Sequence, residues 1–158
     1  MSAADIVLRL VGAFYVFAGI MALRVTLASR FIDVALAAIE AKPPPPAETW
    51  RAAWLALASL LVLAGGLALL LMSDWAPALF AASLLGQVFY LGLLAPRVFD
   101  PHDPPDPSGR RQSINAAVLY AFATAFVLWA AASGKLNAIG DMHPALPALA
   151  AALGALLL

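Results

Sequence analysis

Polar side chains that could bind a ligand recur at helical spacing within apolar stretches of this sequence. Ser83, Gln87 and Tyr90 are three or four residues apart and so share one face of a helix, as do Tyr120 and Thr124. Because hydrocarbon offers no hydrogen-bond partner, such side chains are expected to face another helix or an internal cavity. Both interpretations stay open, either hydrogen bonds between helices or the lining of a ligand site. The candidate ligand-binding residues are Tyr15, Ser83, Gln87, Tyr90, Asn115, Tyr120 and Thr124.

A second group could hold a metal ion. One imidazole and three carboxylates lie within seven residues, at Asp100, His102, Asp103 and Asp106. Imidazole and carboxylate ligands together suit Zn, Mn or Fe. The alternative is a solvated acidic turn in which Asp106 caps the next helix and Pro107 begins it. The other histidine, His143, is expected on the opposite side of the membrane, so the two histidines cannot share a metal or a haem.

Arg9 is the charged residue within the first apolar stretch. An ionised side chain at membrane depth costs free energy, so it needs either an oppositely charged partner or a side chain long enough to reach the headgroups. Because Arg9 lies one turn into the helix, its long side chain can reach the outer headgroups. If it is held inside the bundle instead, we expect Asp74 or Asp141 to be its partner.

Composition excludes several classes of protein. Of the 158 residues, 64% are apolar and 11% charged, which excludes an ordinary water-soluble domain. Nine basic and nine acidic residues give a net charge of +0, so the protein has no overall positive field that would attract nucleic acid. Cysteine is absent, which excludes disulfides and thiolate chemistry. Phosphate loops, nucleophile elbows and HExxH motifs are also absent, so we predict no cofactor and favour a non-catalytic protein.

The apolar residues are grouped into stretches long enough to cross a bilayer, which takes about 20 residues. We therefore predict an all-α fold, a polytopic transmembrane helix bundle forming a single integral membrane domain over residues 1–158. An interfacial amphipathic helix is expected at 24–41 and a short apolar C-terminal helix at 144–158. The predicted spans are residues 6–23, 50–72, 75–95 and 113–133.

The distribution of basic residues predicts the orientation. Seven of the nine lie in or beside the connections 24–50 and 96–112, which are therefore expected on the cytoplasmic side, with the N terminus outside. Nine of the twelve prolines fall in the same two connections, as expected for segments outside the hydrocarbon. We expect a bacterial inner-membrane protein whose basic connections contact anionic lipid headgroups.

Small residues within the predicted spans favour close helix packing. They occur as Gly12 and Gly19, Gly65 and Gly66, Ala82 and Gly86, and Ala117, Ala121 and Ala125. This pattern predicts a compact bundle, a homo-oligomer or a subunit of a larger membrane complex.

Residues 8–33, LRLVGAFYVFAGIMALRVTLASRFID, combine an arginine-led span, two glycines and an amphipathic continuation. With three further spans and this chain length, they resemble the small four-helix DoxX-like membrane proteins. The resemblance implies a compact four-helix bundle that works as a subunit or accessory of a membrane redox or transport system. Many such proteins have a lysine after the stretch that reads AGIMAL here, and this sequence lacks it, so no functional residue is carried over.

Three functions stay open. The first is a non-catalytic accessory or structural subunit of a membrane complex. The second is a binder or carrier of a lipid or hydrophobic small molecule in an intramembrane cavity. The third is a membrane enzyme or metal protein that uses the loop around His102.

The predicted orientation can be tested with topology reporters. A reporter fused after Asp74 is expected outside the cytoplasm and one fused at Ser108 inside it, because a span separates these positions and the basic residues lie beside Ser108. Paired alkaline phosphatase and green fluorescent protein fusions measure both positions. Two fusions on the same side would show that the number of spans is wrong.

Overall fold

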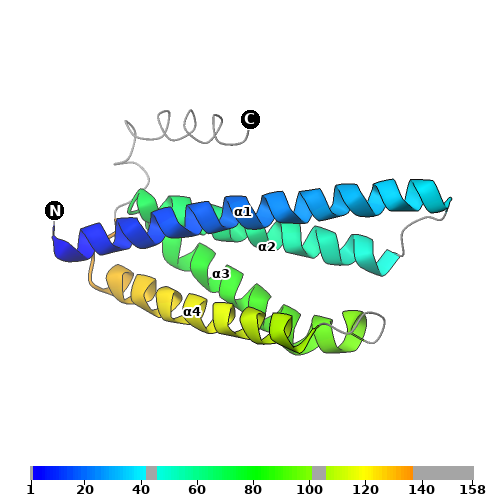
Figure 1. The fold of residues 1–158 in the computed structure, drawn as a ribbon. Coiled ribbons are helices and arrows are strands. Elements are labelled where there is room, and N and C mark those ends of the chain that lie inside the picture. The colour runs from blue at the N-terminus through cyan, green and yellow to red at the C-terminus, as the bar shows by residue number, and fades with distance from the viewer. Residues whose placement is uncertain (1, 42–45, 101–105, 137–158) are drawn as a thin grey trace.

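The computed structural model describes residues 2–41, 46–100 and 106–136. These ranges contain helices and no strand, as predicted. The helices are α1 (Ala3–Glu40), α2 (Pro46–Leu70), α3 (Ala76–Phe89), which continues into the π-helix η1 (Tyr90–Phe99), and α4 (Pro107–Ala132). They run up and down in chain order (Figure 1).

Four helical segments of the described chain are long and apolar enough to cross a membrane. They are Ala3–Ile39, Glu48–Leu70, Ala76–Val98 and Pro107–Ala132. Each overlaps one predicted span, so the prediction of a transmembrane helix bundle is confirmed at this level. These helices fit an integral membrane protein. The predicted C-terminal helix at 144–158 lies outside the described residues.

The helix α1 is longer than predicted because it does not end after the first span. A single helix of 38 residues joins the predicted span 6–23 to the predicted amphipathic segment 24–41. At 1.5 Å per residue it is about 57 Å long, well beyond the roughly 30 Å of hydrocarbon. Residues 20–41, which include the junction of the two segments, contain neither glycine nor proline, so nothing there interrupts the backbone hydrogen bonds. The position of 24–41 on the membrane surface stays a prediction.

The third span also ends later than predicted. Pro96, which we expected in the connection, lies inside η1. A π-helix spaces its hydrogen bonds by five residues, and here the backbone N–H of Asp100 donates to the carbonyl of Ala95 over 2.9 Å. The wider turn accommodates a residue that lacks an N–H and would clash with the preceding turn of an α-helix. Pro107 begins α4, as predicted.

Glycines bring the backbones of α1 and α2 into contact. A Cβ atom built on Gly12 would lie 2.6 Å from the backbone nitrogen of Leu70, and one on Gly66 would lie 2.6 Å from that of Val16. At Gly19 the nearest atoms, those of Leu63, would be 2.8 Å away. Since real Cβ atoms do not approach backbone this closely, α1 and α2 can pack in this way only with glycine at these positions.

The predicted small-residue contact on α3 is different. A Cβ built on Gly86 would meet no described atom within 4 Å. The pair Ala82 and Gly86 therefore makes no close helix contact within the described chain. Ala82 and Gly86 have the four-residue spacing of small residues at helix contacts, but spacing alone does not show whether a second helix packs on them.

The buried core lies at one end of the bundle. It is formed where the N-terminal parts of α1 and α3 meet the C-terminal parts of α2 and α4, around Leu8, Leu69, Phe80, Tyr120 and Val127. By the predicted orientation this is the outer end. Consecutive helices pack on one another, whereas α1 and α4 make few contacts, and Figure 1 shows α4 leading away from α1 toward the other end. The bundle is thus closed at its outer end and open between its first and last helices.

A pair of matched substitutions tests the glycine contact. Gly66→Ala is expected to lower the free energy of unfolding by about 1–3 kcal/mol, because the added methyl group meets the backbone of α1. Gly86→Ala adds the same group in open space and is expected to leave stability unchanged or raise it by up to about 1 kcal/mol. Denaturant unfolding in mixed micelles measures both. Equal effects of the two substitutions would contradict the close contact.

Candidate functional site

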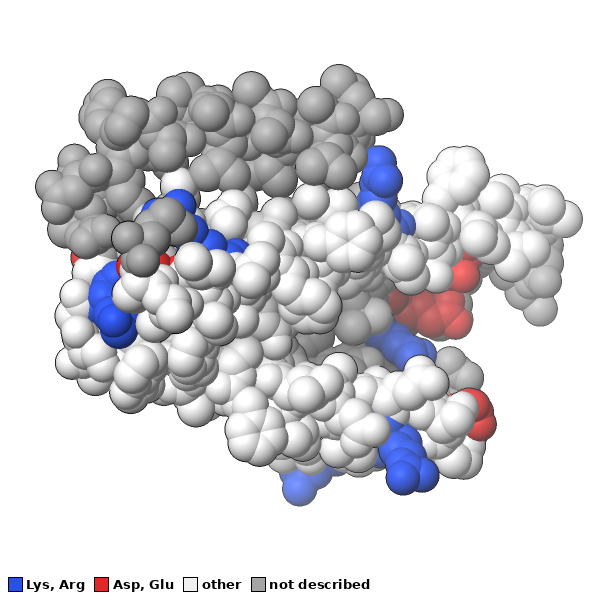
Figure 2. Space-filling view, turned by 60° about the vertical axis from the view of Figure 1, so that its left-hand side comes forward, with Lys and Arg blue, Asp and Glu red and all other residues white. Residues whose placement is uncertain are grey.

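A cavity of about 530 Å³ lies between the four membrane helices. Most of its wall is apolar, with small side chains such as Ala18 and Ala22 of α1 and Ala58 of α2. In Figure 2 the surface is hollowed between the upper and lower parts of the molecule. Cavities of this size and apolar character are typical of sites for small organic ligands. The polar residues of its wall are Tyr15, Thr26, Ser59, Gln87, Tyr90, Ser113 and Tyr120.

An aromatic cluster closes the cavity toward the core. The ring centroids of Tyr15 and Tyr120 are 5.0 Å apart in an edge-on arrangement, and Phe80 lies 5.4 Å from Tyr15. The rings of Phe80 and Tyr120 stack with a centroid distance of 5.2 Å. These contacts join α1, α3 and α4 and form the inner wall at this end.

The side of the cavity between α1 and α4 is its opening, which we call the lateral gap. Its residues are Ala18, Ala22 and Thr26 on α1 and Ser113, Ala116 and Leu119 on α4. Figure 1 shows that α1 and α4 run in opposite directions. Thr26 follows Tyr15 on α1 and Ser113 precedes Tyr120 on α4, so both lie on the same side of the aromatic cluster, toward the other end of the gap. By the predicted orientation this is the cytoplasmic end.

The threonine and serine hydroxyl groups in the cavity wall are bonded to their own helices. Thr26 donates to the carbonyl of Ala22 over 2.8 Å, and Ser59 donates to that of Leu55 over 2.7 Å. Ser113 donates in the same way to its fourth preceding carbonyl, over 3.0 Å. These bonds use the hydroxyl hydrogens, and the lone pairs of the hydroxyl oxygens can still accept a hydrogen bond from a ligand.

Four of the seven predicted ligand-binding residues line the cavity, namely Tyr15, Gln87, Tyr90 and Tyr120. The remaining three do not. Ser83 and Thr124 are buried, where Gln87 donates weakly to Ser83 over 3.5 Å and Thr124 donates to the carbonyl of Tyr120 over 2.8 Å. Asn115 is exposed on another face of α4. Helical spacing found the polar faces but could not tell which turn of each faces the cavity.

Sequence reasoning missed Thr26, Ser59 and Ser113 as candidates. Thr26 lies beyond the predicted end of the first span, and Ser113 is the first residue of the fourth. Apart from their polarity, these residues carry no signal in the sequence, because their role depends on α1 and α4 standing apart at this end.

The hydroxyl of Tyr120 is buried without a satisfied hydrogen bond. The side chain of Ser83 lies close to this hydroxyl, but no hydrogen bond of normal geometry reaches its oxygen from the described residues. A buried polar group without a partner costs stability. The ring of Tyr120 is held by its stacking on Phe80, so the hydroxyl cannot move out to water without breaking that contact.

The predicted partners of Arg9 and the predicted metal ligands are placed only in part. Arg9 is exposed and forms no ion pair with Asp74 within the described chain, while Asp141 lies outside it.

Of the predicted metal ligands, Asp100 pairs with Arg110 of α4. Asp106 occupies the N-cap position of α4, as expected, but its carboxylate accepts from the hydroxyl of Ser108 and makes no capping bond to the backbone.

The remaining histidine and aspartate of the proposed metal site, His102 and Asp103, lie outside the described residues, as does His143. Residues 2–41, 46–100 and 106–136 contain no group of three potential metal ligands. A metal site in this loop therefore stays a prediction.

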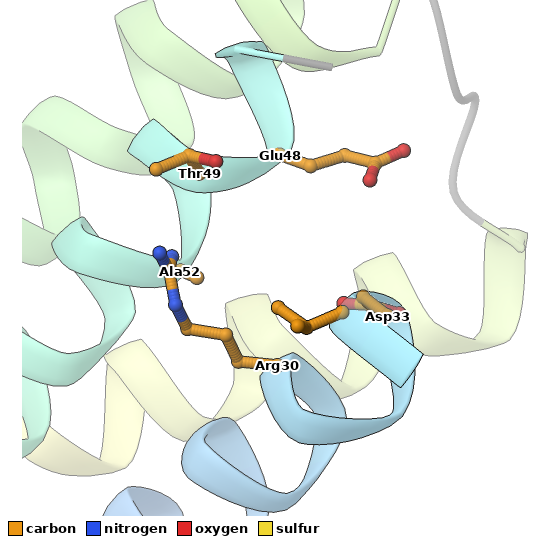
Figure 3. A pocket seen from close by; sticks show the side chains of 6 residues that line it. Arg30, Asp33, Glu48, Thr49 and Ala52 are labelled. Carbon is orange, nitrogen blue, oxygen red and sulfur yellow. The ribbon is translucent and has the colours of Figure 1, made fainter. Parts of the chain in front are cut away.

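A second, much smaller pocket lies between the C-terminal part of α1 and the first turns of α2. Its volume is about 20 Å³, which is room for about one water molecule. Figure 3 shows Arg30 extending from α1 toward Thr49 and Ala52 of α2, with Glu48 pointing away. This pocket is too small for an organic ligand, so the large cavity is the candidate site.

No protein-family model matches the chain, and comparison with characterised proteins and with solved structures finds no significant match. The resemblance of residues 8–33 to DoxX-like proteins therefore stays a prediction.

Removing the buried hydroxyl tests the closed end of the cavity. Tyr120→Phe keeps the stacked ring and removes an unpaired polar atom, so the free energy of unfolding is expected to stay the same or rise by up to about 2 kcal/mol. Phe80→Ala, at a fully buried position, is expected to lower it by about 3–5 kcal/mol. Denaturant unfolding in mixed micelles compares the two. A clear loss of stability in Tyr120→Phe would show that the hydroxyl has a partner.

Proposed function

We propose that this protein binds a lipid or a hydrophobic small molecule in the cavity between its four membrane helices. The observation that supports this function is the cavity of about 530 Å³, which is largely apolar and carries a few polar groups. Ligand sites generally combine an apolar wall with a small number of polar atoms that orient the ligand. The lateral gap between α1 and α4 would let such a ligand enter from the bilayer.

The chemistry of the wall favours binding over catalysis. The described residues that line the cavity include no Asp, Glu, His, Lys or Arg. General acid and base catalysis at neutral pH usually relies on such groups. The tyrosines, the glutamine and the hydroxyl groups of this wall can orient a ligand by hydrogen bonds.

A second candidate, the accessory subunit that we expected first from the sequence, is supported by a different surface. The C-terminal half of α1 exposes large apolar side chains on several faces, with Val25 66%, Phe31 77% and Ile39 81% exposed. Apolar surface of this kind is covered either by lipid or by another protein. An accessory subunit would retain a partner chain through this part of α1.

Filling the cavity tests the binding function. Ala58→Phe places a ring in the cavity, whereas Ala53→Phe makes the same change at an exposed position of α2 outside its wall. Lipids and small molecules retained by protein purified in native nanodiscs are measured by mass spectrometry. We expect the wild type and Ala53→Phe to retain a specific molecule, and Ala58→Phe to retain at least about tenfold less, a difference of about 1.4 kcal/mol.

The same purification separates the two candidate functions. Retention that is equal in Ala58→Phe and Ala53→Phe, or no molecule enriched over the bulk lipid, would contradict a ligand in this cavity. Other polypeptide chains that remain bound in stoichiometric amounts would favour the accessory subunit.

A further inference from the structure

We infer that the cavity takes an uncharged lipid with a hydroxyl group, which donates a hydrogen bond to the side-chain oxygen of Thr26 or of Ser113 while its hydrocarbon chain lies along the cavity toward Tyr15. This inference rests on the proposed function and assigns the chemical class of the ligand and the residues that recognise its polar end. The class includes long-chain alcohols and glycerol esters with a free hydroxyl.

The absence of charged side chains from the described wall disfavours a charged ligand in the cavity. A carboxylate or a phosphate moved from water into an apolar cavity must be paired, because an isolated ion loses its hydration without compensation. The described residues of this wall include no basic side chain that would pair with an anion and no acidic one for a cation. A neutral molecule avoids this cost.

The hydrogen bonds already made by Thr26 and Ser113 favour a hydrogen-bond donor at the polar end of the ligand. Thr26 and Ser113 each donate their single hydroxyl hydrogen to a backbone carbonyl, over 2.8 and 3.0 Å respectively. Their oxygens can still accept. A ligand hydroxyl therefore gains a hydrogen bond without breaking one, whereas an ether or an ester, which only accepts, would have to draw a hydroxyl away from its carbonyl.

The positions of these groups match the way a lipid lies in a bilayer. Thr26 and Ser113 flank the end of the lateral gap that we predict on the cytoplasmic side. From Thr26 to Phe14 the wall follows α1 for twelve residues, or about 18 Å along the helix axis. Ala18 and Ala22 keep this stretch wide enough for a hydrocarbon chain running parallel to the helices.

Two probes that differ in one hydrogen-bond donor test the inference. Dodecan-1-ol and dodecyl methyl ether are titrated, as mole fractions of the bilayer, into full-length protein in nanodiscs, and native mass spectrometry counts the bound molecules. The wild type is expected to bind the alcohol at least about tenfold more tightly than the ether. The variant Thr26→Val with Ser113→Ala is expected to bind the alcohol only as tightly as the ether, with affinity for the ether unchanged.

Matched controls remove the same type of hydroxyl outside the cavity. Thr124 and Ser133 donate to their fourth preceding carbonyls over 2.8 Å, as Thr26 does, but neither lines the cavity. Thr124→Val with Ser133→Ala is therefore expected to keep the preference for the alcohol. Thr26→Ser, which retains the accepting oxygen, is expected to keep it too, and this gentler substitution guards against misfolding of the double variant.

The outcomes separate this inference from the proposed function. Equal binding of alcohol and ether by the wild type, or a preference that survives Thr26→Val with Ser113→Ala, would overturn the hydroxyl recognition and leave the cavity-binding function standing. Binding of neither probe, together with no retained molecule in the Ala58→Phe comparison, would overturn both.

Discussion

The backbone contact between α1 and α2 is the constraint on which the rest of this structure depends. Lipid supplies no hydrophobic force between helices, so association relies on close packing, and Gly12, Gly19 and Gly66 allow the two backbones to touch. This contact fixes the rotation of α1 about its own axis. Tyr15 and Thr26 are then presented toward α4. The cavity wall on this side is thus a consequence of where the glycines lie.

The cavity forms because α4 is held to α1 at one end only. At the closed end, Phe80 and Tyr120 stack on each other and meet the edge of Tyr15, which joins three helices through aromatic rings. At the other end α4 leads away from α1 (Figure 1), and the wall between them carries alanines and short hydroxyl side chains. Their hydroxyls bond to their own backbones, so the wall is polar without needing a partner across the gap.

Helix ends show where local signals were insufficient. We predicted a span over residues 6–23 and a separate amphipathic helix over 24–41, but charged residues are ordinary helix formers and a single helix runs on to Glu40. We expected Pro96 to end the third span, but a π-helical turn accommodates it. The first boundary was drawn where an amphipathic pattern begins and the second where a proline stands, and neither feature by itself ends a helix. What breaks a helix is a missing hydrogen bond that the local geometry cannot replace, and neither position has one.

The sequence by itself determined the four candidate membrane spans of the described chain, because a bilayer requires long apolar stretches whose backbone groups are bonded within the helix. It also indicated which faces are polar, since the positions on one helix repeat with a known period. The tertiary structure alone decided which polar residues share a cavity, bringing Tyr15, Gln87 and Tyr120 to one wall and leaving Asn115 outside. The reason is physical: periodicity fixes residues relative to their own helix, whereas the rotation and tilt of one helix against another follow from the side chains packed between them.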